Sequence, residues 1–152
     1  MRGVEAPGGT VHIVAPFGRD AESIAVILDR QDLSVCIHDS LAQMARQLDD
    51  SAGVVVLTEE AVAGDVEALT AALQAQPPWS DIPFVLLRSS RGAYYNRHTT
   101  LPAAAINVIE LERPLGAVSL QSAISTALRS RQKQFVILSL IHISEPTRPE
   151  RI

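Results

Sequence analysis

The segment Gly53–Leu57 constrains the fold of this chain more than any other part of the sequence. Its five residues, Gly-Val-Val-Val-Leu, form an unbroken apolar run of strand length. A strand without polar positions has both faces buried, which is typical of a parallel sheet covered by helices on each side. The segment therefore predicts a parallel sheet packed between two layers of helices.

Apolar segments of similar length recur along the chain, and helical patterns separate them. The predicted strands are Val11–Ala15, Leu33–Ile37, Gly53–Leu57, Phe84–Leu87 and Ile106–Leu111. The predicted helices are Ala21–Arg30, one that begins at Leu41, Asp65–Gln74 and Leu115–Phe135, each with apolar residues at helical spacing. Strands that alternate with helices through short links predict a doubly wound, five-stranded parallel α/β sheet.

Several local details follow from residue type and position. Asp20 precedes the first helix and is predicted to be its N-cap, while Asp39 and Ser40 precede the second helix in the same way. Cys36 lies inside a predicted strand, where we expect a small, buried apolar residue. Trp79 lies in a link, where it either covers the sheet edge or contacts another protein.

Composition excludes several classes of function. The net charge of −4, the isoelectric point of about 5.5 and the 4% aromatic content argue against nucleic-acid binding. A single cysteine excludes an internal disulfide and a cysteine-based metal site, and the scattered histidines His12, His38 and His98 show no metal-ligand spacing. We expect no metal and no cofactor. No apolar run reaches the length of a membrane span and no export signal is visible, so a cytoplasmic location is expected.

Functional residues of doubly wound sheets gather beyond the carboxyl ends of the strands. There, Arg113-Pro114 ends the last predicted strand directly before a helix. This pair and the order of elements resemble the receiver domain of bacterial response regulators, the chemotaxis-regulator type with flavodoxin-like topology, over residues 10–130. The resemblance implies an acidic pair that holds Mg²⁺ after the first strand, a phosphate-accepting Asp after the third, a Thr or Ser after the fourth and Lys-Pro after the fifth.

The sequence departs from that pattern at almost every position. The acidic pair falls on Ala15, Pro16 or Phe17, the acceptor on Thr58 beside Glu59, the hydroxyl residue on Arg88, and Lys-Pro on Arg113-Pro114. Without these carboxylates there is no Mg²⁺ site of the family type and no residue that forms the acyl phosphate. We therefore expect a degenerate receiver, or pseudo-receiver, that has no catalytic residues and neither autophosphorylates nor transfers phosphate.

Charged residues at the same strand ends suggest a replacement for the lost chemistry. Glu59 or Glu60 should lie near Arg88 and Arg113, and a fixed Glu–Arg pair would hold the domain in one state. The alternative is a cluster of solvated surface charges that contributes little to stability.

The two ends of the chain are expected to lie outside the domain. Residues 1–9 are a Gly/Pro-rich lead, and residues 131–137 extend the last helix as the start of a connector. Leu138–Arg148 matches the translation of a transposase sequencing adapter, so residues 138–152 are expected to be a non-native tail and natural sequence to end near Ile137.

A receiver-like module ahead of a helical connector resembles the N-terminal regions of some sensor histidine kinases. We therefore expect a phosphorylation-incompetent signalling domain of a two-component phosphorelay. It would not itself be an enzyme, and it would contact the kinase domains of its own chain or a signalling partner. The C-terminal helix is a candidate dimer contact. Two alternatives stay open: a small-ligand or nucleotide sensor with a cleft near Pro16, Thr58 and Arg88, and a standalone interaction scaffold.

Overall fold

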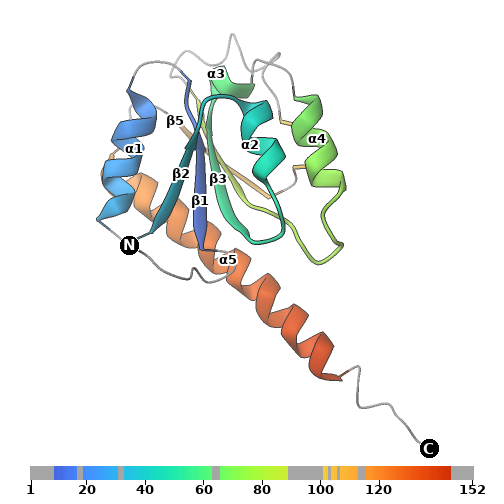
Figure 1. The fold of residues 1–152 in the computed structure, drawn as a ribbon. Coiled ribbons are helices and arrows are strands. Elements are labelled where there is room, and N and C mark those ends of the chain that lie inside the picture. The colour runs from blue at the N-terminus through green and yellow to red at the C-terminus, as the bar shows by residue number, and fades with distance from the viewer. Residues whose placement is uncertain are drawn as a thin grey trace, which may run out of the picture.

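The structure, a computed structural model, describes ten secondary-structure elements (Figure 1). It describes residues 9–16, 19–30, 33–62, 66–88, 101–102, 104–105, 107–112 and 116–144, with the backbone alone for 141–144. The strands are β1 (Thr10–Val14), β2 (Ser34–His38), β3 (Ala52–Thr58), β4 (Phe84–Arg88) and β5 (Val108–Glu112). The helices are α1 (Asp20–Asp29), α2 (Leu41–Gln47), α3 (Glu59–Val62), α4 (Glu67–Gln74) and α5 (Ala117–Ser144).

The five strands form one parallel sheet in the order β2-β1-β3-β4-β5, which confirms the predicted architecture. Helices α1 and α5 cover one face of the sheet, and α2 and α4 cover the other (Figure 1). β3 lies at the centre, and all seven of its residues are buried, as its apolar sequence predicted. The carboxyl ends of the strands therefore share one edge of the sheet, where α3 follows β3.

Two apolar clusters, one on each face of the sheet, form the core. Alternating residues of β1 serve both, because Val11 and Ile13 face α1 and α5 while Val14 faces α2. The helix faces predicted from apolar spacing are largely confirmed. In α2 the buried residues are Leu41, Met44 and Ala45, followed by Leu48, and in α5 they include Leu120, Ile124 and Ala127.

The two predicted helix caps have different outcomes. Asp20 is the first residue of α1, its N-cap is Arg19, and no side chain caps that helix, so the predicted Asp20 cap is wrong. The start of α2 is capped as predicted, because the Ser40 hydroxyl accepts a hydrogen bond from the Gln43 backbone N–H at 3.1 Å. The Gln43 side chain in turn accepts one at 2.7 Å from the N–H of Asp39, the residue before the N-cap.

Cys36 is exposed, which contradicts its predicted burial. The reason is strand order, because β2 lies at the edge of the sheet and pairs with β1 alone. A second difference is the short helix α3, which the sequence did not predict and which begins immediately after Thr58. The helix after it begins at Glu67, while the predicted start, Asp65, lies outside the described residues.

Arg131 anchors α5 to the end of the sheet opposite α3. Its side chain is fully buried and donates hydrogen bonds from Nε to the Ala52 carbonyl and from Nη2 to the Asp50 carbonyl, both at 2.8 Å. Nη1 donates to the Gln134 side chain at 2.6 Å. Burial lowers the pKa of Arg131 to about 10, although the nearby carboxylates of Asp50 and Asp81 oppose that shift.

Two aromatic rings pack against the Arg131 side chain. The Arg131 guanidinium carbon lies 4.9 Å from the Phe135 ring centroid and 5.4 Å from that of Trp79, within range of a cation–π attraction. Trp79 therefore packs against α5, and its ring centroid is 5.0 Å from that of Phe135. Gln134 exchanges two hydrogen bonds of 2.8 Å with the backbone of Asp81. Residues 131–135 thus contact the domain, and α5 continues past them (Figure 1).

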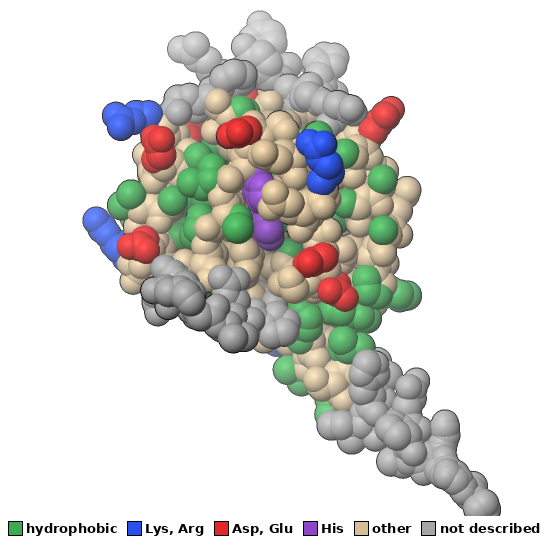
Figure 2. Space-filling model, viewed as in Figure 1, with side chains coloured by type: hydrophobic (Ala, Val, Ile, Leu, Met, Phe, Trp, Pro, Cys, Tyr) green, Lys and Arg blue, Asp and Glu red, His purple; other side chains and the backbone are tan. Residues whose placement is uncertain are grey.

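Three findings bear on partners. Figure 2 shows acidic and basic side chains interspersed over the face that β2 and its flanking helices form. None of the helices in the described part of the chain combines the length and the apolarity that crossing a bilayer requires. Beyond the Arg131 anchor, α5 exposes apolar side chains at Val136, Ile137 and Leu140.

Candidate functional site

The candidate site lies at the carboxyl edge of the sheet, where β3 and β4 end at Thr58 and Arg88. Pro16, which follows β1, is exposed, and Thr58 is almost fully buried. Three predicted site residues, Phe17, Arg113 and Pro114, lie outside the described residues. The structure therefore brings together the central part of the predicted site.

Arg88 is held between two carboxylates. Its Nε and Nη2 donate to the two carboxylate oxygens of Glu110 at 3.0 and 3.2 Å, a bidentate arrangement. Its Nη1 donates to Glu59 Oε2 at 3.3 Å. The planar guanidinium can serve both partners because its donors point along different edges of the fork.

Strand register explains why Glu110 reaches Arg88. β4 and β5 are parallel, with Arg88 aligned to Glu112 and Leu86 aligned to Glu110. Residues two apart on a strand share a face, so Arg88 and Glu110 are diagonal neighbours on the same face of the sheet. The long arginine side chain spans that diagonal.

Chain direction explains the position of Glu59. This residue follows the last residue of β3 and opens α3, so the turn from strand to helix holds its side chain against the neighbouring strand end. Its side chain is 5% exposed and that of Arg88 is 11% exposed, whereas that of Glu110 is 53% exposed. One contact of Arg88 is therefore buried and the other meets solvent.

The neighbouring carboxylates stabilise the charged form of the Arg88 guanidinium. Its hydrogen bond to Glu110 is the largest cause that raises the pKa of the guanidinium above its usual value. Burial acts in the opposite direction, and the contact with Glu59 adds to the rise. Arg88 therefore stays charged wherever the protein is folded near neutral pH.

The predicted Glu–Arg pair is confirmed for Glu59 and Arg88, because these two side chains are too buried to be solvated surface charges. Glu110 was missed. Its signal lay in the alternation of apolar and acidic residues in β5, which places Glu110 and Glu112 on the same face as Arg88 once the register is known. Arg113, the other predicted arginine of the cluster, lies outside the described residues.

Ion pairs hold the side chains of the cluster in place. One cation lies between two carboxylates, and the neighbouring Thr58 hydroxyl is buried within the sheet, with the residue 1% exposed. Within the described ranges, no three His, Cys, Asp or Glu side chains lie close enough together to hold a metal ion.

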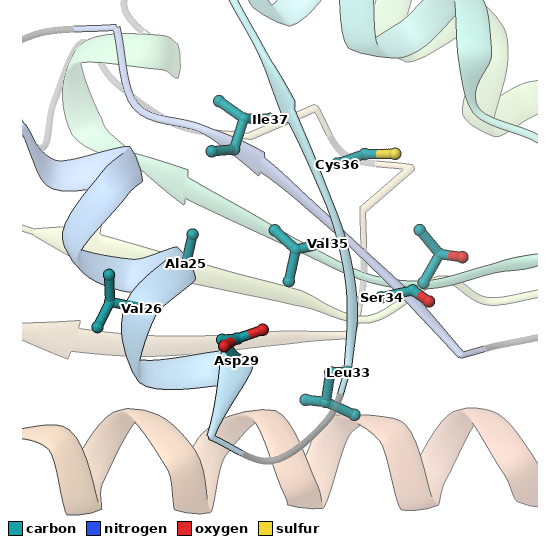
Figure 3. A pocket seen from close by; sticks show the side chains of 9 residues that line it. Ala25, Val26, Asp29, Leu33, Ser34, Val35, Cys36 and Ile37 are labelled. Carbon is teal, nitrogen blue, oxygen red and sulfur yellow. The ribbon is translucent and has the colours of Figure 1, made fainter. Parts of the chain in front are cut away.

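A separate hollow lies at the edge of the sheet that β2 forms. A pocket of about 510 Å³ opens between α1 and β2, lined by residues that include Ala25, Val26, Val35 and Ile37 (Figure 3). The Cys36 side chain points away from α1 in this view. The pocket shares no residue with Pro16, Thr58 or Arg88, so it is distinct from the strand-end cleft that a ligand sensor was expected to use.

Comparisons with known proteins agree with this geometry at the level of the fold. No protein-family model matches the sequence, and a comparison with curated proteins finds no match. Among solved structures, a response regulator receiver domain protein from Bacillus halodurans is similar at a TM-score of 0.58 and 18% identity, covering 78% of this chain and 95% of that one. A response regulator receiver protein from Sinorhizobium medicae has a TM-score of 0.59 and 16% identity, with 80% and 95% covered.

A third similar structure carries a different name. The adenylate cyclase from Rhodopirellula baltica has a TM-score of 0.67 and 12% identity, covering 89% of this chain and 98% of that one. Together with the strand order, these likenesses show that the chain has the receiver fold of response regulators, a five-stranded parallel sheet of flavodoxin-like topology.

Proposed function

We propose that this chain is a phosphorylation-incompetent receiver-like signalling domain that acts by contact with other proteins. It belongs to a two-component phosphorelay and carries out no reaction of its own. The receiver fold supports the signalling context, and the strand-end residues support the absence of phosphotransfer.

The observation that carries this proposal is the Glu59–Arg88–Glu110 cluster. The receiver resemblance places the phosphate acceptor at Thr58, the switch hydroxyl at Arg88 and the basic residue at Arg113. It places the metal-binding acidic pair at Ala15, Pro16 or Phe17, none of which is acidic. In place of an acceptor carboxylate and a mobile hydroxyl, a guanidinium is fixed 3.3 Å from Glu59 and 3.0 Å from Glu110. A permanent ion pair occupies the place of a reversible modification, so the domain keeps one conformation.

The proposed partner is a protein, either the kinase domains of a sensor histidine kinase in the same chain or a separate signalling protein. The path of α5 supports a physical connection, because the helix is anchored at Arg131 and then continues with Val136 and Ile137 exposed. Those two apolar residues also make α5 a candidate dimer contact. Light scattering of the full chain and of a Val136→Ser, Ile137→Ser variant tests this: a dimer held by α5 becomes a monomer in the variant.

The kinase context is tested by sequencing the source locus past the codon for Ile137. We propose that residues 138–152 derive from the adapter and that the natural frame continues into a helix with a phosphoacceptor histidine and an ATP-binding domain. A stop codon within a few residues instead favours a module that works alone. A genomic match to Leu138–Arg148 contradicts the adapter origin.

A further inference from the structure

Two histidines that are far apart in the sequence meet inside the domain. His12 Nδ1 lies 3.0 Å from His38 Nε2, and the two residues are 7% and 4% exposed. The ring centroids are 5.2 Å apart and the ring planes differ by 19°. The centroids are farther apart than the facing nitrogens by about two ring radii, so the rings meet edge to edge, in nearly one plane. Figure 2 shows, in purple, histidine side chains that reach the surface in this view.

This geometry permits only certain protonation states. In the neutral pair, one imidazole donates its N–H and the other accepts with its lone pair. A first added proton goes to the outer nitrogen of the donor ring, which keeps the hydrogen bond but places a charge in a buried site. A second proton puts hydrogens on both facing nitrogens, so the hydrogen bond breaks and two cations face each other.

The pair joins the edge strand to the rest of the sheet. His12 lies in the middle of β1, and His38 is the last residue of β2, aligned with Val14. β2 has a strand neighbour on one side alone. A side-chain hydrogen bond between β1 and β2 therefore adds directly to the contacts that hold the edge strand in place.

Among the described residues, few charged groups lie near the pair. β1, β2 and β3 contain no charged residue, and α2, which packs against β1 and β2, contains Arg46, whose side chain is exposed. Asp39, directly after β2, raises the pKa of His38, but burial is the larger cause and lowers it. Asp49, directly beyond α2, interacts with His12, which helps to lower the pKa of Asp49 after the larger effect of its hydrogen bond with Ser51.

We propose that the His12–His38 hydrogen bond is a proton-sensitive latch on the edge strand β2: the neutral pair holds the strand against β1, and proton uptake in acid releases it. The direction follows from linkage. An unfolded histidine has a pKa of about 6.5, and burial lowers that of His38, so His38 binds fewer protons in the folded state than in the unfolded state. The stabilisation is complete above about pH 6.5 and is lost as the pH falls from there through the lowered pKa.

Hydrogen exchange tests the latch on the whole chain. Exchange is followed by mass spectrometry at about pH 7.5 and pH 5, with rates corrected for the intrinsic chemistry, in peptides from β2 and from β4, which pairs with β3 and β5. The wild-type protein should lose at least about tenfold more protection in β2 than in β4 on acidification. His38→Gln keeps a hydrogen-bonding side chain but cannot titrate, so its β2 protection should fall no more than that of β4. The same substitution at His142 is the matched control and should behave as wild type.

Equal loss of protection in β2 and β4 of the wild type, or a selective β2 loss that survives in His38→Gln, would overturn the proposal. A substitution that opens β2 at every pH leaves the variant uninformative, so a second measurement on the wild type is included. The ring C–H resonances of His12 and His38 are titrated by NMR. The proposal expects the His38 midpoint below that of an unfolded control peptide, and a midpoint equal to that of the peptide contradicts it.

Discussion

Arg88 and Glu59 form an ion pair of 3.3 Å between the ends of two neighbouring central strands, with side-chain exposures of 11% and 5%. Their position matters because the carboxyl edge of a doubly wound sheet is where such folds place their chemistry. Removing Arg88 takes this cation away from the largely buried Glu59 carboxylate, which is costly because burial keeps most of the water away from that charge. The pair therefore keeps this edge rigid, and replacing either residue should destabilise the domain.

Replacing Arg88 should destabilise the domain far more than replacing its exposed partner. Arg88→Met leaves the buried Glu59 carboxylate without its cation and should lower the free energy of unfolding by about 3 kcal/mol. Glu110→Gln affects a contact that is half exposed and should cost about 1 kcal/mol or less. Urea denaturation near neutral pH measures both. Arg19→Met is the control, because Arg19 pairs with Glu22 at 90% and 70% exposure and should change stability by less than about 0.5 kcal/mol.

The same pair predicts that the stability losses of its two single variants do not add up in the double variant. Glu59→Gln combined with Arg88→Met removes both charges, so the double variant should be more stable than the sum of the two single losses predicts. Additive losses, or an Arg88→Met variant that matches Arg19→Met, would show that the contact contributes nothing to folding.

Arg131 should be irreplaceable by lysine. Its guanidinium satisfies the carbonyls of Ala52 and Asp50 at once, and Arg131→Met removes both hydrogen bonds, of which the one to Ala52 is buried, so the change should cost about 3 kcal/mol. Arg131→Lys keeps the charge but lacks the planar fork, so its stability should lie between that of the wild type and that of Arg131→Met. Arg129→Met, on the exposed side of the same helix, is the matched control. Equal thermal midpoints for Arg129→Met and Arg131→Met are the result that contradicts the anchor.

The Ser40 cap of α2 gives a smaller and more local effect. Ser40→Ala removes the acceptor of the Gln43 N–H and should lower the free energy of unfolding by about 1 kcal/mol. Ser40→Asp supplies another oxygen at the same place and should retain most of the stability. Ser23→Ala, at an exposed interior position of α1, should leave stability unchanged or slightly higher. Chemical denaturation distinguishes the three, and a loss shared by Ser23→Ala would remove the capping explanation.

Asp49 predicts a pH dependence in the acid range. Its carboxylate accepts hydrogen bonds from the Ser51 hydroxyl at 2.6 Å and the Ser51 N–H at 3.0 Å, and the first of these is the largest cause that lowers the pKa of Asp49. A lowered folded pKa stabilises the protein above the unfolded pKa, and this contribution disappears as the pH falls through the folded value. Ser51→Ala should therefore be less stable than wild type near pH 7, and the difference should shrink as the pH falls below the ordinary aspartate range and vanish once Asp49 is protonated in the folded state. A difference that persists in acid would mean that Ser51 acts in another way.

Sequence patterns were sufficient for the sheet because each strand and helix carries its own signal. The run Gly53–Leu57 gave the buried central strand, and the spacing of Leu41, Met44 and Ala45 gave the inner face of α2. The Glu59–Arg88 pair was also accessible, since parallel strands place their carboxyl ends side by side. These inferences need only the order of elements along the chain.

The misses depend on information that local patterns do not contain. Cys36 is exposed because β2 is at the sheet edge, and Glu110 meets Arg88 because of the register between β4 and β5. The contact between His12 and His38 spans 26 positions and requires both strand order and register. The Asp20 cap failed by one residue, which is the usual scale of uncertainty at a helix end.

The most direct test is to expose the full chain to a small-molecule phosphodonor, such as phosphoramidate, with Mg²⁺ in excess. Intact-mass spectrometry at neutral pH follows the protein, and a receiver domain with an intact acceptor Asp serves as the positive control. We predict that the control gains a phosphoryl group and that this chain does not, because Arg88 and its carboxylates occupy the strand ends and Thr58 is buried. A Mg²⁺-dependent phosphorylated species on this chain would contradict the proposal that its signalling works without phosphotransfer.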